Sequence, residues 1–308
     1  MSAAVAPEQV GTLDPAKKTQ RVKARLTSRG ATTAAIIIAA LWTLPTFGLF
    51  VSSFRPEDKL SNSGWWTVLT PEHWGWTLSN YHAVLFESGA SSASLGSYFV
   101  NSIVISVPAT LFPLVIALMA AYAFAWIPFK GSSWIFVTVF ALQIVPLQMA
   151  LIPLIRIFNS PWLDISGSFA AVWVAHTIFG LPLAIFLLHN FISEIPREIM
   201  EAARVDGASH TQMFLKIIIP LSLPAIASIG IFQFLWVWND LLVALVFSGG
   251  GVGVAPVTQR LAQLAGQYGN SWEILTAAAF VSIIVPLIVF FSLQKYFVRG
   301  LLAGSTKG

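Results

Sequence analysis

The sequence contains no cysteine and very little charge, and both shortages narrow the possible functions. The absence of cysteine among the 308 residues excludes disulfides, thiolate catalysis and metal sites of the CxxC type. Charged residues make up 10% of the chain, whereas about a quarter of a soluble domain is charged. Hydrophobic residues make up 56%, and the mean hydropathy is +0.76. This composition is typical of a membrane protein.

Motifs for nucleotide and hydrolytic chemistry are also missing. No GxxxxGK[ST] loop occurs, so the chain has no usual cradle for ATP phosphates. Neither HExxH nor GxSxG occurs, and the apolar stretches contain no paired carboxylates. We therefore predict that this chain has no catalytic residue, no metal site and no cofactor. We also predict no nucleic-acid partner, because the basic residues follow membrane topology instead.

Six apolar stretches are each long enough to cross a bilayer, which takes roughly 20 helical residues. They are 31–53, 98–126, 134–155, 169–192, 221–247 and 274–294. The first follows a basic leader, but it is too long for a signal peptide and lacks a convincing cleavage site, so we interpret it as a retained anchor. The sequence thus predicts an all-α membrane protein with six transmembrane helices.

Lysine and arginine are distributed unequally between the two sides that six spans define. One side has only Arg55, Lys59, Arg156 and Arg260, while the other thirteen of the 17 basic residues lie on the side of both termini. Basic residues in short loops stay in the cytoplasm. Both termini are therefore predicted to be cytoplasmic in a multi-pass protein of the bacterial inner membrane. The basic leader would also contact anionic membrane lipid.

A long external loop, 54–97, is rich in tryptophan. It contains Trp65, Trp66, Trp74 and Trp76. Indoles favour the membrane–water interface, where the ring is half buried and its N–H stays wet. We therefore predict an interfacial aromatic belt, with stacking on a sugar as the alternative.

A charged segment, EAARVDGASHTQMFLKIIIPLSLP (201–224), lies between two long apolar stretches. Residues 193–206 are predicted to form a short helix with Ile195, Ile199 and Ala202 or Ala203 on one face. The alanines keep that face shallow, so another backbone could approach it closely. Carboxylates outnumber basic residues here, which disfavours an anionic lipid surface and favours a protein partner.

The same segment carries local signals for a turn and a second helix. Gly207 is placed to adopt the left-handed conformation that ends a helix. Ser209 is followed three residues later by Gln212, which predicts a capping box. Pro220 predicts a bend into the next span. These signals predict a compact helix-turn-helix held against the cytoplasmic face.

This segment resembles the EAA signature of permease subunits in binding-protein-dependent ABC importers. The matching positions are Glu201, Ala202, Ala203, Gly207, Ile217, Ile219 and Pro220, with isoleucine where leucine usually precedes the proline. TLSNYHAVL (77–85), FVNSIVIS (99–106), WND (238–240) and QKYFVRGLLAGSTKG (294–308) resemble the carbohydrate branch, in particular the second permease of maltose and α-glucoside systems. The resemblance covers nearly the whole chain from residue 31 onward.

The resemblance implies a type I ABC importer permease fold with three parts. These are a basic cytoplasmic leader at 1–30, a six-helix permease domain at 31–296 with a coupling loop at 193–220, and a cytoplasmic tail at 297–308. The tail would reach the interface of an ATPase dimer or remain loose in solvent. The external loop 248–272 would probe a binding protein or serve as a flexible connector.

The resemblance also implies partners and a coupling role. Glu201, Ala202, Ala203, Asp206 and Gly207 would form a coupling helix seated in a cytoplasmic ABC ATPase. The ATPase dimer would bind ATP and Mg. The other implied partners are a second permease, with which this chain forms a heterodimer, and an extracytoplasmic sugar-binding protein. Such a complex would import a carbohydrate, for example an α-glucoside such as maltose or trehalose.

Polar residues within the spans are the candidates for a substrate pathway, because placing a polar group in a membrane is costly. The candidates are Asn101, Gln143, Gln148, Trp238, Asn239 and Asp240. Asp240 leads this group, and the alternative is an interfacial carboxylate paired with Arg260. In maltose-type relatives the other permease provides most sugar contacts, so the resemblance implies few in this chain.

Three alternatives stay open at this point. One is an ABC permease for another class of solute, which would share the EAA segment. Another is an ion-coupled secondary transporter, although six spans without a carboxylate cluster fit this poorly. The third is an intramembrane enzyme, which the missing motifs disfavour.

Overall fold

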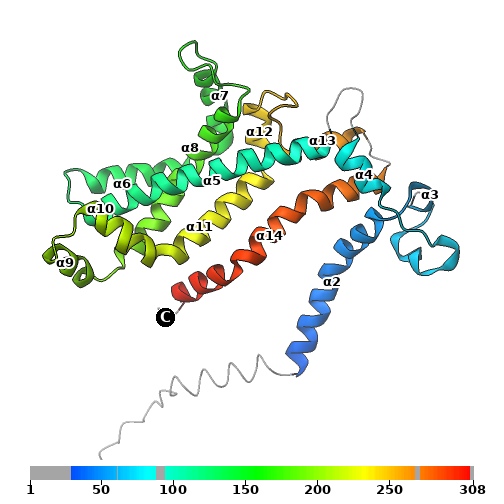
Figure 1. The fold of residues 1–308 in the computed structure, drawn as a ribbon, viewed down its shortest axis with the longest axis horizontal. Coiled ribbons are helices and arrows are strands. Elements are labelled where there is room, and N and C mark those ends of the chain that lie inside the picture. The colour runs from blue at the N-terminus through cyan, green and yellow to red at the C-terminus, as the bar shows by residue number, and fades with distance from the viewer. Residues whose placement is uncertain (1–28, 61, 88–93, 268–270, 306–308) are drawn as a thin grey trace, which may run out of the picture.

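The protein is described by a computed structural model over residues 29–60, 62–87, 94–267 and 271–305. Within these residues every regular element is a helix (Figure 1). The elements are α2 (Arg29–Ser53), α3 (Glu57–Leu60), η1 (Trp65–Leu69), η2 (Pro71–His73), α4 (Ser79–Phe86), α5 (Leu95–Trp126), α6 (Ser132–Ala141), η3 (Leu142–Ile144), α7 (Leu147–Phe158), α8 (Phe169–Ser193), α9 (Arg197–Val205), α10 (His210–Met213), η4 (Phe214–Ile218), α11 (Ile219–Asn239), α12 (Leu242–Phe247), α13 (Val257–Gln267) and α14 (Trp272–Ser305).

The predicted spans agree with the structure in number, with one qualification. Five helical segments of the described chain are long and apolar enough to cross a membrane, and a sixth span exists if one bent pair is counted together. That pair consists of 132–144 and 147–158, which meet at 103°. The apolar stretch 134–155 is therefore a broken span, with a sharp bend between its two helices. Pro146 cannot donate a backbone hydrogen bond and disfavours helical geometry at Val145, which is extended here.

Two other predicted spans have different ends in the structure. The stretch 221–247 is divided, because α11 ends at Asn239 and α12 begins at Leu242. The last helix, α14, continues past residue 294 to Ser305 and so includes most of the predicted tail. Residues 1–28 of the leader and 306–308 of the tail lie outside the described residues.

The core of the bundle forms where α5 packs along α8. Small residues line this contact: Ala109, Ala117 and Ala121 of α5 and Ala171 and Ala175 of α8 are all 0% exposed. Small side chains let two helix backbones approach closely, which favours helix association in membranes. By contrast α2 packs chiefly against α14 and exposes most of its apolar surface. An exposed apolar surface of this kind suits contact with lipid.

The two groups of short helices lie at opposite ends of the long ones. Figure 1 shows α9 and α10 beside one end of α5, and α3, α4 and α13 around the other. This arrangement is expected if the charged segment and the tryptophan-rich loop lie on opposite sides of a membrane.

Candidate functional site

The charged segment forms the predicted helix, but the helix begins later than expected. α8 continues through Ser193, whose hydroxyl donates to the backbone oxygen of His189 at 2.7 Å. Pro196 is extended (φ −55°, ψ 134°) and precedes the first helical residue, Arg197. The prediction of a helix from residue 193 is therefore wrong at its start. The helix α9 is therefore separate from α8 and is joined to it by a short turn.

One face of α9 is anchored in the protein. Met200 is 0% exposed, and it packs in a cluster with Ile195 before the helix and Met213 after it. Met200 is not among the residues predicted to share a face, and Ile199, predicted on one face with Ile195, is 39% exposed whereas Ile195 is 8% exposed. The sequence pattern could have indicated that Met200 lies on the packed face, since Met200 and Ala203 are three positions apart and share a face of the helix.

The opposite face of α9 is uncovered. Val205 is 88% exposed, and Glu201, Ala202 and Asp206 are exposed as well. Gly207 has the predicted left-handed conformation (φ +78°), and no atom lies within 4 Å of where its Cβ would be. The five residues predicted for coupling thus lie together at the C-terminal end of α9, except that Ala203 turns partly inward.

The turn after α9 is held by the predicted local contacts. The backbone N–H of Gly207 donates to the oxygen of Arg204 at 3.0 Å, and that of Ala208 donates to Ala203 at 2.9 Å. The capping box is confirmed: the N–H of Ser209 donates to Gln212 Oε1 at 2.8 Å, and the N–H of Gln212 donates to Ser209 Oγ at 3.3 Å. These bonds fix the direction in which the chain leaves α9.

The segment after the capping box connects the turn to the bundle. Tyr122 of α5 is hydrogen-bonded through its hydroxyl to His210 Nδ1 at 2.9 Å, and its ring packs against Phe214. Residues Phe214–Ile218 form a π-helical segment that leads into α11. Such segments are rare and occur often at functional sites. The segment that follows α9 therefore contacts α5 through Tyr122 and continues directly into α11.

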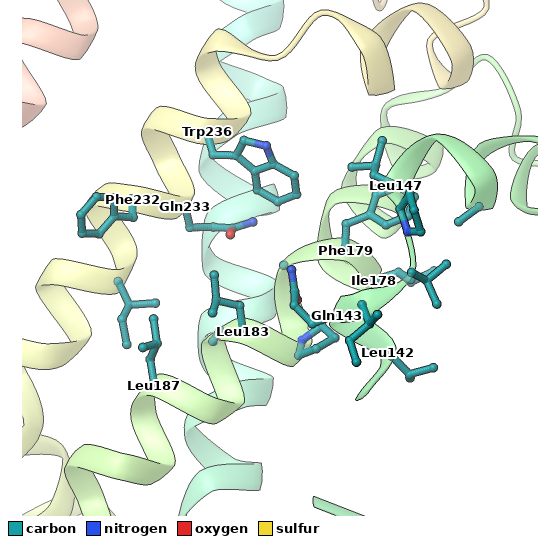
Figure 2. Close-up of a pocket in the computed structure, with 18 residues that line it drawn as sticks. Leu142, Gln143, Leu147, Ile178, Phe179, Leu183, Leu187, Phe232, Gln233 and Trp236 are labelled. Carbon is teal, nitrogen blue, oxygen red and sulfur yellow. The ribbon is translucent and has the colours of Figure 1, made fainter. Parts of the chain in front are cut away.

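A second feature is a pocket of about 840 Å³ between the α6–α7 bend, α8 and α11. Its lining is mostly aliphatic and aromatic, as Figure 2 shows. Gln143, next to the bend, is the one predicted pathway residue in this lining. Gln233 and Trp236 of α11 also line the pocket. Neither of these two residues is among the candidates predicted for a pathway.

The other amides predicted for a pathway have different surroundings. Asn101 Nδ2 donates to the oxygens of Val252 and Ala255 at 3.0 and 3.1 Å, which ties α5 to the external loop. Asn239 Nδ2 donates to Leu235 at 2.7 Å within α11. Gln148 is exposed at the start of α7 and does not line the pocket.

The tryptophan and the carboxylate of the predicted group also lie outside the pocket lining. Trp238 is 2% exposed, and its Nε1–H donates to the oxygen of Ser282 in α14 at 3.0 Å. Asp240 Oδ2 accepts from the N–H of Ala244 at 3.1 Å and lies 3.8 Å from His176 Nε2. Both residues hold the outer part of α11 to its neighbours.

The alternative pairing of Asp240 with Arg260 is not found. The Arg260 guanidinium lies 5.8 Å from the centre of the Tyr98 ring, and its Nη1 is 3.5 Å from Gln263 Oε1. Asp240 instead faces His176, a buried residue of α8. The packing of α8 against α11 and α12 brings Asp240 to His176.

The external loop is organised around a buried arginine. Arg55 is 0% exposed, and its Nη1 donates to the oxygen of Gly64 at 2.8 Å. Asn80 Nδ2 donates to the oxygens of Ser53 and Arg55 at 3.0 and 2.8 Å. Burial lowers the pKa of the Arg55 guanidinium, while nearby Asp58 raises it.

Three of the four loop tryptophans are exposed, which fits both an interfacial belt and stacking on a sugar. Trp66, Trp74 and Trp76 are 63%, 63% and 52% exposed, and Trp65 packs against Phe47 of α2. The described residues bring together no group of three His, Asp or Glu side chains that could hold a metal ion.

Known protein families and curated proteins include clear relatives of this chain. Residues 113–302 match the family described as binding-protein-dependent transport system inner membrane component. The chain is 54% identical to the osmoprotective compounds uptake permease protein GgtD of Synechocystis sp., over 89% of this chain and 90% of that one. It is 41% identical to the alpha-glucoside transport system permease protein AglG of Rhizobium meliloti, over 89% and 95%.

Solved structures agree with the fold. A bacterial ABC transporter involved in the import of the acidic polysaccharide alginate matches with a TM-score of 0.70 and 21% identity, covering 89% of this chain and 98% of that one. A second alginate transporter structure, in complex with a pentasaccharide-bound periplasmic protein, matches with a TM-score of 0.58 and 16% identity, covering 91% and 98%.

Proposed function

Because this chain belongs to the family of binding-protein-dependent transport system inner membrane components, we propose that it is the permease subunit of an ATP-driven importer for a neutral sugar. The observation that carries the proposal is the uncovered face of α9, centred on Val205 and Gly207. The chain lacks a phosphate-binding loop of its own. The energy for transport must therefore enter from a partner, and α9 is the element suited to receive it.

The construction of α9 supports docking on a cytoplasmic ATPase. Its inner face is fixed through Met200, so the helix cannot shift without moving the residues packed against it. Its outer face presents Val205, a large apolar side chain with 88% of its surface in solvent, beside the carboxylates of Glu201 and Asp206. An apolar anchor with charged neighbours is typical of a protein interface. The Ala202 and Gly207 positions would let the partner approach closely.

The sugar class rests on the relatives. AglG is named for alpha-glucosides, and a 31% identical relative from Halalkalibacterium halodurans is named for arabinooligosaccharides. GgtD is named for the uptake of osmoprotective compounds. An α-glucoside such as maltose or trehalose is the substrate we propose.

The complete importer would contain several chains. We propose an ATPase dimer that binds ATP and Mg, a second permease that pairs with this one, and an extracytoplasmic binding protein that delivers the sugar. The position of α9 and the tryptophan-rich loop at opposite ends of the bundle supports a bacterial inner-membrane protein with both termini in the cytoplasm (Figure 1). The described end of α14 would then point to the ATPase side.

The mechanism follows from the contacts behind α9. Closure of the ATPase dimer on ATP would displace α9, and Met200 and Met213 would pass this displacement to the cluster between α5, α8 and η4. The bundle would then change from an inward-open to an outward-open arrangement. Such a change needs an element that interacts differently with its partner in two states, and α9 is that element.

The test is a charge substitution at the uncovered apolar residue. Val205→Asp removes no internal contact, so the protein should fold, but it places a charge where an apolar anchor would dock. We expect loss of ATPase copurification and at least a tenfold fall in ATP-dependent uptake of labelled maltose and trehalose into liposomes that contain all subunits.

The control is Val252→Asp, the same change at an exposed valine of the external loop. It should leave ATPase copurification unchanged. Normal copurification with Val205→Asp would overturn the coupling assignment. Uptake without ATP by this chain alone would instead indicate an ion-coupled transporter.

A further inference from the structure

The pocket beside the α6–α7 bend is apolar except for three side chains. These are Gln143, Gln233 and Trp236, and none of the residues that line it is charged. Figure 2 shows Gln233 and Trp236 extending into the space from α11 and Gln143 extending from the opposite wall. Polar groups in a membrane are costly and usually face a wet pathway or a ligand. Their convergence in one pocket therefore calls for an explanation.

Gln233 is held in one orientation. Its Nε2 donates to the oxygen of Ala109 in α5 at 3.2 Å, and the residue is only 9% exposed. Gly180 of α8 makes room for it, because a Cβ at that position would lie 2.7 Å from the Gln233 amide atoms. With Nε2 engaged, Oε1 has no hydrogen-bond donor among the described residues. The glutamine thus presents a fixed acceptor at the pocket.

Trp236 is also fixed. Its ring meets the buried His176 edge to face, with centres 5.4 Å apart and planes at 90°. His176 in turn lies 3.8 Å from Asp240. The indole remains 37% exposed, and its N–H donates to no group in the described part of the chain. Trp236 therefore brings to the pocket both a flat aromatic surface and an indole N–H donor.

Gln143 reaches the pocket because the chain bends at Pro146. The amide is exposed and makes no hydrogen bond within the described residues. Gln148, five residues later on the far side of the bend, is exposed but does not line the pocket. The bend thus separates two similar amides, one inside the pocket and one outside.

We propose that these three side chains form a sugar subsite within this chain. Amide groups match hydroxyls, since they both donate and accept hydrogen bonds, and an indole face packs against the C–H face of a pyranose ring. The absence of charge in the lining favours a neutral ligand over an ionic solute. A volume of about 840 Å³ is in the range of small-molecule sites. The inference rests on the proposed function and deepens it. The family resemblance alone implies that the other permease of the heterodimer, and not this chain, makes most of the sugar contacts.

The absence of cysteine makes the test direct. Gln143→Cys introduces the only thiol of the chain, and Gln148→Cys provides a matched control across the bend. The complete transporter is incubated with its binding protein, ATP and EDTA, which prevents hydrolysis. Labelling by a small maleimide is followed on this chain with and without maltose or trehalose, and with glycine betaine as a non-sugar osmoprotectant. We expect at least fivefold slower labelling at residue 143 with the sugar that is transported, and unchanged labelling at 148.

A functional variant complements the labelling. Gln143→Leu keeps the size of the side chain and removes no internal hydrogen bond, so the protein should fold. We expect uptake to fall about tenfold, equivalent to about 1.4 kcal/mol, whereas Gln148→Leu should transport at the wild-type rate. Trp236→Phe, which removes only the indole N–H donor and part of the ring, should show a smaller loss.

The outcomes separate the two proposals. Sugar uptake by the wild type with equal labelling at residue 143 in the presence and absence of sugar would overturn the subsite and leave the sugar importer intact. The same conclusion would follow if residues 143 and 148 were protected equally, since that would report a conformational change or coverage by the second permease. Uptake of glycine betaine without any sugar would overturn the proposed substrate class itself.

Discussion

At one end of the bundle α9 leaves Val205 88% exposed, whereas at the opposite end the external loop buries Arg55 completely. The apolar residue faces solvent and the charged one does not, which reverses the usual distribution. Around Arg55 the loop supplies hydrogen-bond acceptors for both Nη atoms of the guanidinium: the oxygens of Gly64 and Lys59, and Ser63 Oγ. Around Val205 the chain supplies nothing.

This difference separates two kinds of surface. The external end is folded on itself, with Arg55 and Asn80 joining α2, the loop and α4. At the α9 end the two faces of the helix differ: the face with Met200 is packed, and the face with Val205 is exposed and is the one on which we propose that the ATPase docks. Substitutions should therefore damage folding at the external end and on the inner face of α9, and damage only assembly on its outer face.

The largest effect is expected for Met200→Ala. Removing a large side chain that is 0% exposed should destabilise the docked position of α9 by about 2 to 5 kcal/mol. Hydrogen exchange across 194–213 should accelerate strongly, and transport should be lost because α9 no longer moves with the bundle. Ile199→Ala, at the adjacent and 39% exposed position, is the control and should change exchange little. Similar effects of both substitutions would mean that α9 is not anchored on one face.

A smaller effect is expected for Arg55→Met at the other end. The methionine replaces the aliphatic stem but removes the guanidinium's hydrogen bonds to the oxygens of Gly64 and Lys59 and to Ser63 Oγ, at a cost of about 2 to 3 kcal/mol. Hydrogen exchange in the loop 54–87 should increase, while copurification with the ATPase stays normal. Lys59→Met, a half-buried neighbour, should have little effect. Loss of ATPase association with Arg55→Met would break the separation between the two ends.

The features that the sequence predicts well are those decided by neighbouring residues. The left-handed Gly207 and the capping box of Ser209 with Gln212 depend on groups within three or four positions, and all are present. Six apolar stretches are likewise visible from length and composition. The EAA segment could be recognised because its signature consists of particular residue types at fixed spacing within about twenty residues.

Features that depend on distant packing could not be predicted in the same way. Pro108 and Pro113 lie inside the continuous α5, whereas Pro146 ends a helix, and nothing within the local sequence distinguishes them. Trp236 and Trp238 are two residues apart, so they occupy different faces of α11. Only the neighbouring α14, where Ser282 accepts from Trp238, decides which of the two is buried.

The smallest effect is expected for Tyr122→Phe, which tests how the open end communicates with the bundle. The substitution removes the hydrogen bond to His210 and keeps the ring contact with Phe214, so it should weaken the junction by about 1 kcal/mol. We expect normal ATPase association but more ATP hydrolysed for each sugar imported, because α9 would move with less effect on α5. His210→Ala should give the same change, and the double variant should add little, since both remove one contact. Additive effects would show that the two residues act separately, and an unchanged ratio of ATP to sugar would place the coupling route in the buried cluster around Met200 and Met213 alone.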